Sequence, residues 1–178
     1  MVRTLDSIES IGVVGAGTMG SGIAQVAAQS GYDVVMRDIK EEFVQNGFDS
    51  IESSLDRFVS KEKIGEEEAE ATLDRISGTT ELADLADCDL VIEAAVEDMD
   101  IKQDIFEDLD EEIPEDVILA TNTSTLSITT IASVTDREDQ IVGLHFMNPV
   151  PVMTGVEVVV GEKTDEEVAA FAHALAGD

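Results

Sequence analysis

Short apolar runs alternate along the chain with longer amphipathic segments. The apolar runs predict β-strands at residues 11–14, 32–36, 90–94, 117–120, 141–146 and 156–160. The longer segments predict helices at residues 19–30, 41–60, 66–75, 100–110, 126–133 and from residue 164 to the end. Because strands and helices alternate, we expect an α/β fold in which helices cover both faces of a mostly parallel sheet.

The length fits one domain. A chain of 178 residues with 43% hydrophobic residues can bury a sizeable core, and it is too short for two full domains. The sequence has neither an internal repeat nor a low-complexity linker. We therefore expect residues 1–178 to form a single domain.

The charge balance is strongly acidic. Asp and Glu total 40 against 10 for Lys and Arg, so the formal net charge is −30. Such a surface repels phosphate backbones and anionic lipids, so we expect neither a nucleic-acid partner nor a membrane surface. The well-formed apolar runs argue against disorder. We interpret the acidity as adaptation to concentrated salt; an ordinary acidic cytosolic protein is the alternative.

The cysteine content and the N-terminal segment bear on the compartment. The one cysteine, Cys88, cannot form a disulfide within the chain, which fits a reducing compartment. We interpret it as a packed, inert thiol. The N-terminal segment has no long apolar stretch, so we expect no signal peptide or membrane span and a cytoplasmic location. The acidic triplets at 66–68 and 110–112 indicate solvated surface, and we expect no metal site.

A G-x-G-x-x-G motif follows the first predicted strand and opens the first predicted helix. Its residues are Gly15, Ala16, Gly17, Thr18, Met19 and Gly20. In this context the first glycine permits a tight turn, and the second lets the backbone approach a pyrophosphate. The third lets the helix pack close to the strand. The helix N-terminus offers unpaired N–H groups to the anion, so the motif predicts a dinucleotide site.

The second predicted strand ends beside a carboxylate that bears on the choice of cofactor. Asp38 follows Gly20 by 18 residues, where a carboxylate can hydrogen-bond both ribose hydroxyls of NAD and would repel the 2′-phosphate of NADP. Arg37 could accept that phosphate, but neighbouring side chains along a strand point to opposite faces. We therefore expect NAD.

The chain has two histidines, and their settings differ. His173 lies among alanines in the last predicted helix, and we interpret it as structural. His145 lies at the end of a predicted strand, and ligands of open α/β sheets bind beyond the carboxyl ends of strands. Histidine also suits alcohol oxidation, which needs a base that titrates near neutrality. We therefore take His145 as the candidate base.

Further polar residues lie at other strands. Ser124 ends the run 121–124 after one strand, and Glu93 and Glu97 follow another. Glu157 lies among valines in the last predicted strand, where a buried carboxylate is costly unless it has a partner. A histidine is the natural partner, so we hypothesise a pair with His145. The sequence by itself leaves this contact open.

Four stretches resemble the 3-hydroxyacyl-CoA dehydrogenase family. They are GAGTMGSGIAQ from residue 15, VIEAAVE from residue 91, TNTS from residue 121 and HFMNPVPVM from residue 145. The match runs in order over nearly the whole chain, and four spaced motifs are far more specific than one glycine turn. The resemblance implies a doubly wound Rossmann-type domain. It also implies an NAD-dependent enzyme that interconverts (3S)-3-hydroxyacyl-CoA and 3-ketoacyl-CoA in fatty-acid or butanoate metabolism, as in β-oxidation.

The resemblance further implies catalytic roles. His145 would take the proton of the 3-hydroxyl as hydride leaves C3 for the nicotinamide. Glu157 would orient and support that histidine. Ser124 would hydrogen-bond the reacting oxygen and the nicotinamide side, and Asn148 would help to bind the nicotinamide end.

The remaining implied contacts concern the cofactor and the substrate. Glu97 and Lys102 match family positions that contact NAD. Ser54 and Lys61 match positions near the CoA moiety, across a variable helix. Acyl-CoA is therefore the implied substrate.

Two features depart from the family pattern. Thr154 and Gly155 stand where the family usually has a lysine and a bulky aliphatic residue. The family's second, helical domain, which closes the cleft and makes the dimer, is absent from these 178 residues. We therefore expect a homo-oligomer or a partner chain that supplies the helical domain.

Other functions remain as alternatives. The chain could be an NAD-binding subunit or regulator with little turnover of its own. Another Rossmann dehydrogenase, acting on a sugar or a β-hydroxyacid, is disfavoured by the motif that begins at His145. A serine hydrolase using Ser124 is disfavoured because Ser124 lacks the G-x-S-x-G elbow.

Overall fold

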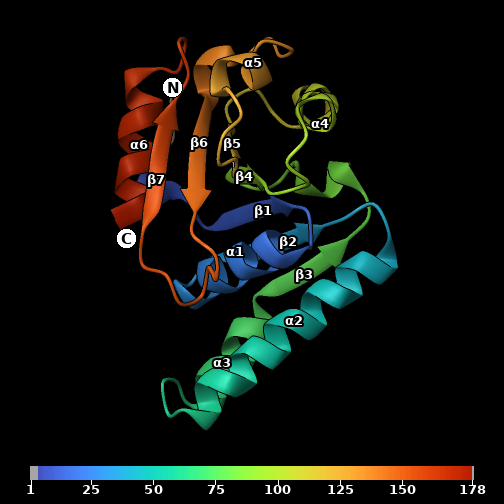
Figure 1. The fold of residues 1–178 in the computed structure, drawn as a ribbon, viewed down its shortest axis with the longest axis vertical. Helices are drawn as coiled ribbons and strands as arrows, with labels where there is room; N and C mark the ends of the chain where they lie inside the picture. The colour runs from blue at the N-terminus through green and yellow to red at the C-terminus, as the bar shows by residue number, and fades with distance from the viewer. Residues whose placement is uncertain (1–3, 178) are drawn as a thin grey trace.

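A seven-stranded sheet forms the centre of the computed structural model, which describes residues 4–177 (Figure 1). The spatial order of the strands is β3-β2-β1-β4-β5-β6-β7. The strands are β1 Ser10–Val14, β2 Asp33–Arg37, β3 Ile76–Thr79, β4 Leu90–Glu93, β5 Ile118–Thr121, β6 Ile141–Phe146 and β7 Val156–Val160. All neighbouring pairs are parallel except β6 and β7, which are antiparallel. The expected mostly parallel sheet is confirmed.

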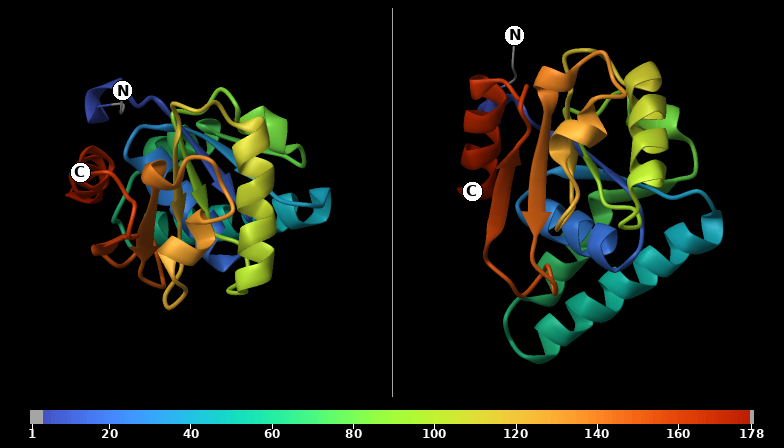
Figure 2. Two further views of the ribbon diagram at one scale, coloured as in Figure 1. Left: turned by 90° about the horizontal axis from the view of Figure 1, so that it is seen from above. Right: turned by 45° about the horizontal axis from the view of Figure 1, so that its top comes forward.

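Helices cover both faces of the sheet. They are α1 Thr18–Gln29, α2 Glu41–Ser60, α3 Glu66–Asp74, α4 Met99–Glu112, α5 Ile128–Ala132 and α6 Glu166–Gly177. One buried apolar layer contains residues of α1, α2 and α6, and a second layer contains residues of α4 and α5. Figure 2 shows α4 and α6 on opposite sides of the strands. The doubly wound arrangement is therefore confirmed.

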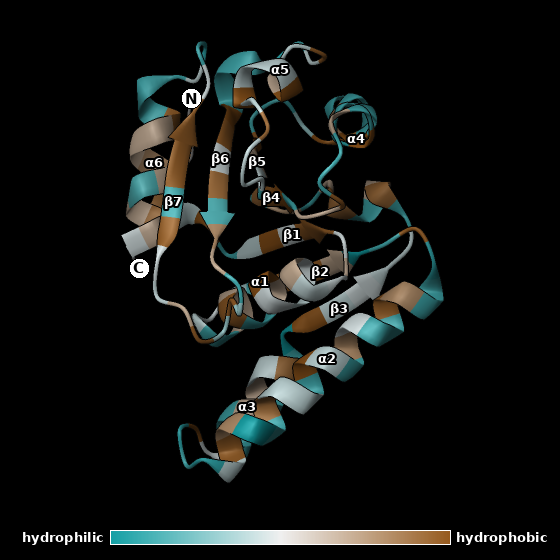
Figure 3. Ribbon diagram, in the orientation of Figure 1, coloured by the Kyte–Doolittle hydropathy of each residue, from teal (hydrophilic) through white to brown (hydrophobic). Residues whose placement is uncertain are grey.

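The strand side chains alternate between the two apolar layers. Leu90 and Ile92 belong to the layer of α1, and Val91 between them belongs to the layer of α4. Every residue of β4 and β5 is buried, as expected for parallel strands covered on both faces. Strands β1, β6 and β7 are largely brown, the hydrophobic colour, in Figure 3. Within residues 4–177, none of the helices has the length and apolar character needed to cross a bilayer.

The structure adds elements that the hydrophobic pattern did not predict. Strand β3 has four residues, Ile-Ser-Gly-Thr, with only one large apolar side chain. It forms because its backbone pairs in parallel with β2 at the sheet edge. Three short 3-10 helices also escaped the pattern: η1 Leu5–Ser7, η2 Leu82–Leu85 and η3 Glu138–Gln140. The last two predicted helices are confirmed but begin two residues later than expected, at Ile128 and Glu166.

The strand order reverses between β1 and β4, which creates a crevice at their carboxyl ends. β1 continues along the chain to β2 on one side, whereas β4 continues to β5 on the other. Loops that leave two such strands diverge, and ligands of doubly wound sheets bind in the gap. The glycine motif and the loops after β4 and β5 all lie at this edge. The long helix α2 extends with α3 beyond the sheet in Figure 1.

Candidate active site

The glycine motif forms the turn between β1 and α1. Gly15 has a φ of +104°, a conformation that side chains disfavour, and a Cβ there would lie 2.7 Å from the Ala94 carbonyl oxygen. A Cβ on Gly20 would lie 1.8 Å from the Gly15 carbonyl oxygen. The first and third glycines therefore allow the tight turn and the close approach of α1, as their sequence positions predicted.

The second glycine leaves room for a ligand. Gly17 is the N-cap of α1, it is exposed, and a Cβ there would meet no protein atom within 4 Å. Thr18 is also exposed, and Met19 is half-buried. Although the chain has 40 acidic residues, the first turn of α1 contains none. Open space, free N–H groups and a positive helix end fit a pyrophosphate.

Asp38 and Arg37 face different partners. Asp38 lies just after β2, and its carboxylate accepts hydrogen bonds from the amides of Ala16 and Ile39, each at 2.7 Å. The acid group therefore lies directly beside the glycine turn, where the ribose of a dinucleotide would come. Arg37 instead donates to the Thr80 carbonyl oxygen at 3.1 Å. This geometry fits NAD and holds the arginine away from a 2′-phosphate.

His145 lies between a carboxylate and a hydroxyl. The antiparallel register of β6 and β7 places it opposite Glu157, and its Nδ1 is 2.7 Å from the Glu157 Oε2. Its Nε2 is 3.1 Å from the Ser124 Oγ. Because a carboxylate only accepts hydrogen bonds, this geometry selects the tautomer whose proton is on Nδ1, and the lone pair of Nε2 then faces Ser124. The hypothesised contact between His145 and Glu157 is confirmed.

The burial expected for Glu157 is wrong. Its side chain is 62% exposed, whereas that of His145 is 19% exposed. The reason is the position of β7, which is the last strand of the sheet and leaves Val159 and Val160 exposed too. The apolar run at 156–160 therefore forms an edge strand. The Glu157 carboxylate on it remains in contact with water.

Glu97 holds the loop that carries Ser124. Its Oε1 accepts from the Thr123 hydroxyl at 2.5 Å, the Ser124 amide at 2.9 Å and the Thr125 amide at 3.3 Å. Burial by itself would raise the pKa of Glu97. The hydrogen bonds from Thr123 and Ser124 and the charge of Lys102 outweigh it and lower that pKa below its ordinary value of 4.5. The carboxylate is thus ionised at neutral pH.

Lys102 does not line the crevice, contrary to the expectation that it contacts the cofactor. Its side chain is fully buried, and its ammonium group lies 2.7 and 2.8 Å from the two carboxylate oxygens of Glu93. Glu93 is fully buried too, so it needs a cation or several donors to remain charged there. The buried acid at the end of β4 therefore draws the lysine inward.

Asn148 lies on a second cleft beside the glycine turn. This cleft, of about 370 Å³, lies between the start of α1, the end of α2 and the loop at 148–152. Ser54 and Lys61 line it together with Asn148, so the structure brings the expected nicotinamide-end and CoA residues to one cleft. The Asn148–Pro149 peptide bond is cis.

Lys61 was predicted near the CoA moiety, but two further cations beside it were missed. Arg57 also lines it, and Lys63 lies close by along the chain. Arg57, Lys61 and Lys63 form no ion pair with any carboxylate in residues 4–177, whereas Arg75, Lys102, Arg137 and Lys163 each do. Three cations within seven residues, at and just after the end of α2, were the available signal in a chain with only 10 Lys and Arg. We call these three residues the basic corner.

Cys88 and His173 lie apart from the site. Burial, followed by the charges of Asp89 and Asp87, raises the pKa of the Cys88 thiol to about 11. The thiol is therefore protonated at neutral pH and inert, as expected. His173 is exposed on α6.

Comparison with known proteins agrees with this geometry. The family described as "3-hydroxyacyl-CoA dehydrogenase, NAD binding domain" matches residues 10–178. The chain belongs to this family. NAD is accordingly the cofactor of the matched domain, and the enzymes of the family are oxidoreductases.

Individual relatives extend beyond this chain. A probable 3-hydroxybutyryl-CoA dehydrogenase of Deinococcus radiodurans is 51% identical over 89% of the chain and 56% of its own length. The human mitochondrial hydroxyacyl-coenzyme A dehydrogenase is 42% identical over 94% of the chain and 57% of its own length. The crystal structure of (S)-3-hydroxybutyryl-CoA dehydrogenase from Ralstonia eutropha superposes with a TM-score of 0.93 and 48% identity, covering 96% of this chain and 60% of that one. The chain thus spans little more than half the length of these relatives.

Proposed function

We propose that this chain is the NAD-binding half of an enzyme that interconverts (3S)-3-hydroxyacyl-CoA and 3-ketoacyl-CoA. The observation that carries the proposal is the hydrogen-bonded series Ser124, His145 and Glu157, at 3.1 and 2.7 Å, on the sheet edge that also bears the glycine turn. The printed names of the relatives support the substrate class. Fatty-acid or butanoate metabolism, including β-oxidation, is the pathway that fits it.

His145 acts as the general base in this proposal. Glu157 holds the Nδ1 proton, so the lone pair of Nε2 is free to take the proton of the substrate 3-hydroxyl. The same carboxylate then stabilises the imidazolium that forms, and Ser124 can hydrogen-bond the substrate oxygen. NAD supplies the acceptor for the hydride that leaves C3. In the reverse direction the imidazolium returns its proton to the oxygen of the reduced ketone.

The cofactor would lie along the crevice. The glycine turn at 15–20 would hold the pyrophosphate and Asp38 the adenosine ribose. Glu97, Ser124 and Asn148 would surround the nicotinamide end. Gly17 and Thr18 of the turn are exposed, as are Glu97, Ser124 and Asn148, and Asp38 is half-buried.

The basic corner supports a CoA substrate. CoA carries several phosphate charges, and a surface of net charge −30 repels them everywhere that cations are not concentrated. Arg57 and Lys61 line the cleft that Ser54 and Asn148 share, so they offer guanidinium and ammonium groups to those phosphates. The acyl end would then point toward His145.

A turnover assay with acetoacetyl-CoA and NADH in about 2 M KCl, where charge repulsion is screened, tests the proposal. We expect His145→Gln to lower kcat by about 100-fold or more while NADH binding persists, since loss of a general base costs 10²–10⁴ in rate. His173→Gln, at the exposed second histidine, is the matched control and should behave as the wild type. Absence of NADH binding by the wild type would overturn the proposal.

An NAD-binding subunit with little activity is the second candidate function. It is favoured by the family model that matches residues 10–178, which describes an NAD binding domain. Tight NADH binding without turnover by this chain would establish it.

A homo-oligomer or a partner chain belongs to the same proposal. Val152, which lines the cleft, and the next residue, Met153, are 56% and 49% exposed and would be covered by a further domain or a second chain. A monodisperse monomer in light scattering at high salt would count against self-association.

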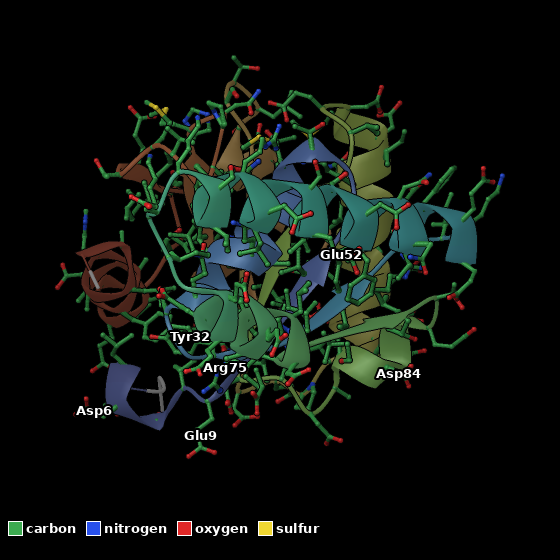
Figure 4. All side chains as sticks on the ribbon, turned by 90° about the horizontal axis from the view of Figure 1, so that it is seen from below. Asp6, Glu9, Tyr32, Glu52, Arg75 and Asp84 are labelled. Carbon is green, nitrogen blue, oxygen red and sulfur yellow. The ribbon has the colours of Figure 1, made fainter. Side chains whose placement is uncertain are left out.

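We infer a salt-adapted, cytoplasmic protein. Figure 4 shows side chains tipped with oxygen around the whole outline, and the labelled residues Asp6, Glu9, Glu52 and Asp84 are all exposed. Concentrated salt screens such charges, with a Debye length of about 3 Å at 1 M. The buried, unpaired thiol of Cys88 suits a reducing compartment.

A further inference from the structure

A buried ion pair lies beneath the loop that carries Ser124. Lys102 on α4 and Glu93 at the end of β4 both have fully buried side chains, and two hydrogen bonds of 2.7 and 2.8 Å join them. The Glu93 carboxylate also accepts from the Ala95 amide at 2.7 Å and from the Thr121 hydroxyl at 2.6 Å. Every polar atom of the pair is therefore satisfied from within the protein.

Lys102 also faces a second carboxylate. Its ammonium group lies 3.8 Å from the Glu97 Oε2. The other oxygen of Glu97 accepts the hydroxyl of Thr123 and the amides of Ser124 and Thr125. Lys102 thus links Glu93, at the buried end of β4, to Glu97, which holds the loop at 122–125. From this loop the Ser124 hydroxyl contacts the His145 ring.

The loop at 122–125 depends on the Glu97 carboxylate, because that side chain is the acceptor for the Ser124 and Thr125 amides. The Asn122 amide, by contrast, donates to the Glu93 backbone carbonyl at 2.7 Å. If the Glu97 side chain turned away, the Ser124 and Thr125 amides would lose their hydrogen-bond acceptor. The Asn122 amide would keep its hydrogen bond to the Glu93 backbone carbonyl. Glu97 has a 40% exposed side chain, and the buried ammonium is the cation that holds it in place.

We propose that Lys102 is a positioning residue: through Glu97 it fixes the loop at 122–125, so that Ser124 keeps its hydroxyl on His145. The buried pair with Glu93 fixes the lysine itself. The consequence for catalysis rests on the proposed function. The contact chain does not, and it can be tested on the unliganded chain.

Amide hydrogen exchange on a double variant tests the proposal. Lys102→Met alone would leave Glu93 charged and unpaired in the core, so the chain could fail to fold. Glu93→Gln combined with Lys102→Met removes both charges, and the new amide can still accept from Ala95 and donate to the Thr121 oxygen. We expect the Ser124 and Thr125 amides to exchange about tenfold faster, whereas Asn122 keeps its rate.

A second ion pair, which also involves a residue of α4, provides the matched control. Arg137 and Asp110 form an ion pair of 2.6 Å at the other end of α4, with side chains 5% and 17% exposed. Asp110→Asn combined with Arg137→Met should lower stability without changing the exchange of Ser124 or Thr125 relative to Asn122. The proposal therefore requires a local effect that general destabilisation does not produce.

Catalysis provides a second readout, which rests on the proposed function. We expect a lower kcat in the Glu93→Gln, Lys102→Met variant, because Ser124 no longer keeps its hydroxyl on His145. Wild-type exchange at Ser124 and Thr125 in the folded double variant would overturn the proposal, whether or not NADH affinity falls. Because the exchange measurement needs neither turnover nor cofactor, it remains decisive even if the chain proves inactive.

Discussion

At the residue scale, the Asp38 carboxylate combines a structural and an electrostatic task. It accepts two backbone amides beside the glycine turn, and its charge lies where a 2′-phosphate would come. Asp38→Asn keeps one acceptor oxygen and removes the charge. We expect the ratio of NADPH to NADH affinity to rise about tenfold, because the repulsion of a phosphate disappears. Fluorescence titration with both cofactors measures it, and an unchanged ratio would show that Arg37 or sterics set the preference.

Glu97 gives a pH dependence of defined sign. Its folded-state pKa is depressed below 4.5, so the native state favours the carboxylate. Its contribution to stability is therefore present above about pH 4.5 and is lost as the pH falls through the folded-state pKa. We expect the urea midpoints of wild type and Glu97→Gln to differ near pH 7 and to converge as the pH falls through the folded-state pKa. A difference that persists in acid would refute this account.

The site residues show how far single positions can be read from sequence. His145 was predicted because a histidine at a strand end is a specific chemical signal, and its contact with Glu157 follows from the β6–β7 register. Lys102 was placed at the cofactor by resemblance, whereas the structure buries it. The order of residues along the chain does not show that the Glu93 carboxylate lies within hydrogen-bond distance of the Lys102 ammonium group.

At the element scale, the turn between β1 and α1 separates a folding requirement from a binding requirement. Gly20→Ala would place a Cβ 1.8 Å from the Gly15 carbonyl oxygen, so α1 must shift. We expect it to lower the free energy of unfolding by roughly 1–3 kcal/mol and to weaken NADH binding. Urea unfolding and NADH titration measure the two effects.

Gly17→Ala is the matched variant in the same turn. Its Cβ meets no protein atom within 4 Å, so we expect stability to stay within about 0.5 kcal/mol of the wild type. NADH binding should nevertheless weaken about tenfold or more, because the methyl group occupies the approach to the pyrophosphate. Unchanged NADH affinity would mean that the dinucleotide lies elsewhere.

Most helices and strands were predictable from the sequence, whereas β3 and the three 3-10 helices were not. Strands β1 and β4 are covered on both faces of the sheet, so their sequences are apolar runs. These runs were enough to predict both strands. Strand β3 has the sequence Ile-Ser-Gly-Thr, and its pairing partner β2 decides its conformation. Whether β7 runs parallel or antiparallel likewise depends on the strand that it pairs with. The local sequence does not specify that strand.

At the scale of the whole molecule, the net charge of −30 predicts a strong dependence on salt. Raising KCl from about 0.1 M to about 2 M shortens the Debye length from roughly 10 Å to less than 3 Å, which screens the mutual repulsion of surface carboxylates. We expect the Tm to rise by roughly 4–8 °C, which corresponds to about 2 kcal/mol for a chain of this size. Calorimetry across salt concentrations measures it.

A charge-reducing variant provides the control for that experiment. Glu111 and Glu112 are exposed in the last turn of α4, which has no basic residue and is the negative end of the helix. Glu111→Gln with Glu112→Gln should raise the Tm in low salt and have little effect in high salt. A Tm that is independent of salt in both chains would refute the salt-adapted interpretation.

The sequence by itself determined the α/β class, the glycine turn, the acidic surface and the identity of the candidate base, because each depends on local pattern, composition or a motif of fixed spacing. Only the tertiary structure decided that Glu157 is exposed on an edge strand, that Lys102 is buried against Glu93, and that Arg57 and Lys61 share a cleft with Asn148. These features depend on which segments become neighbours in space. Strand order, register and burial are set by the packing of the whole chain, and no single segment carries that information.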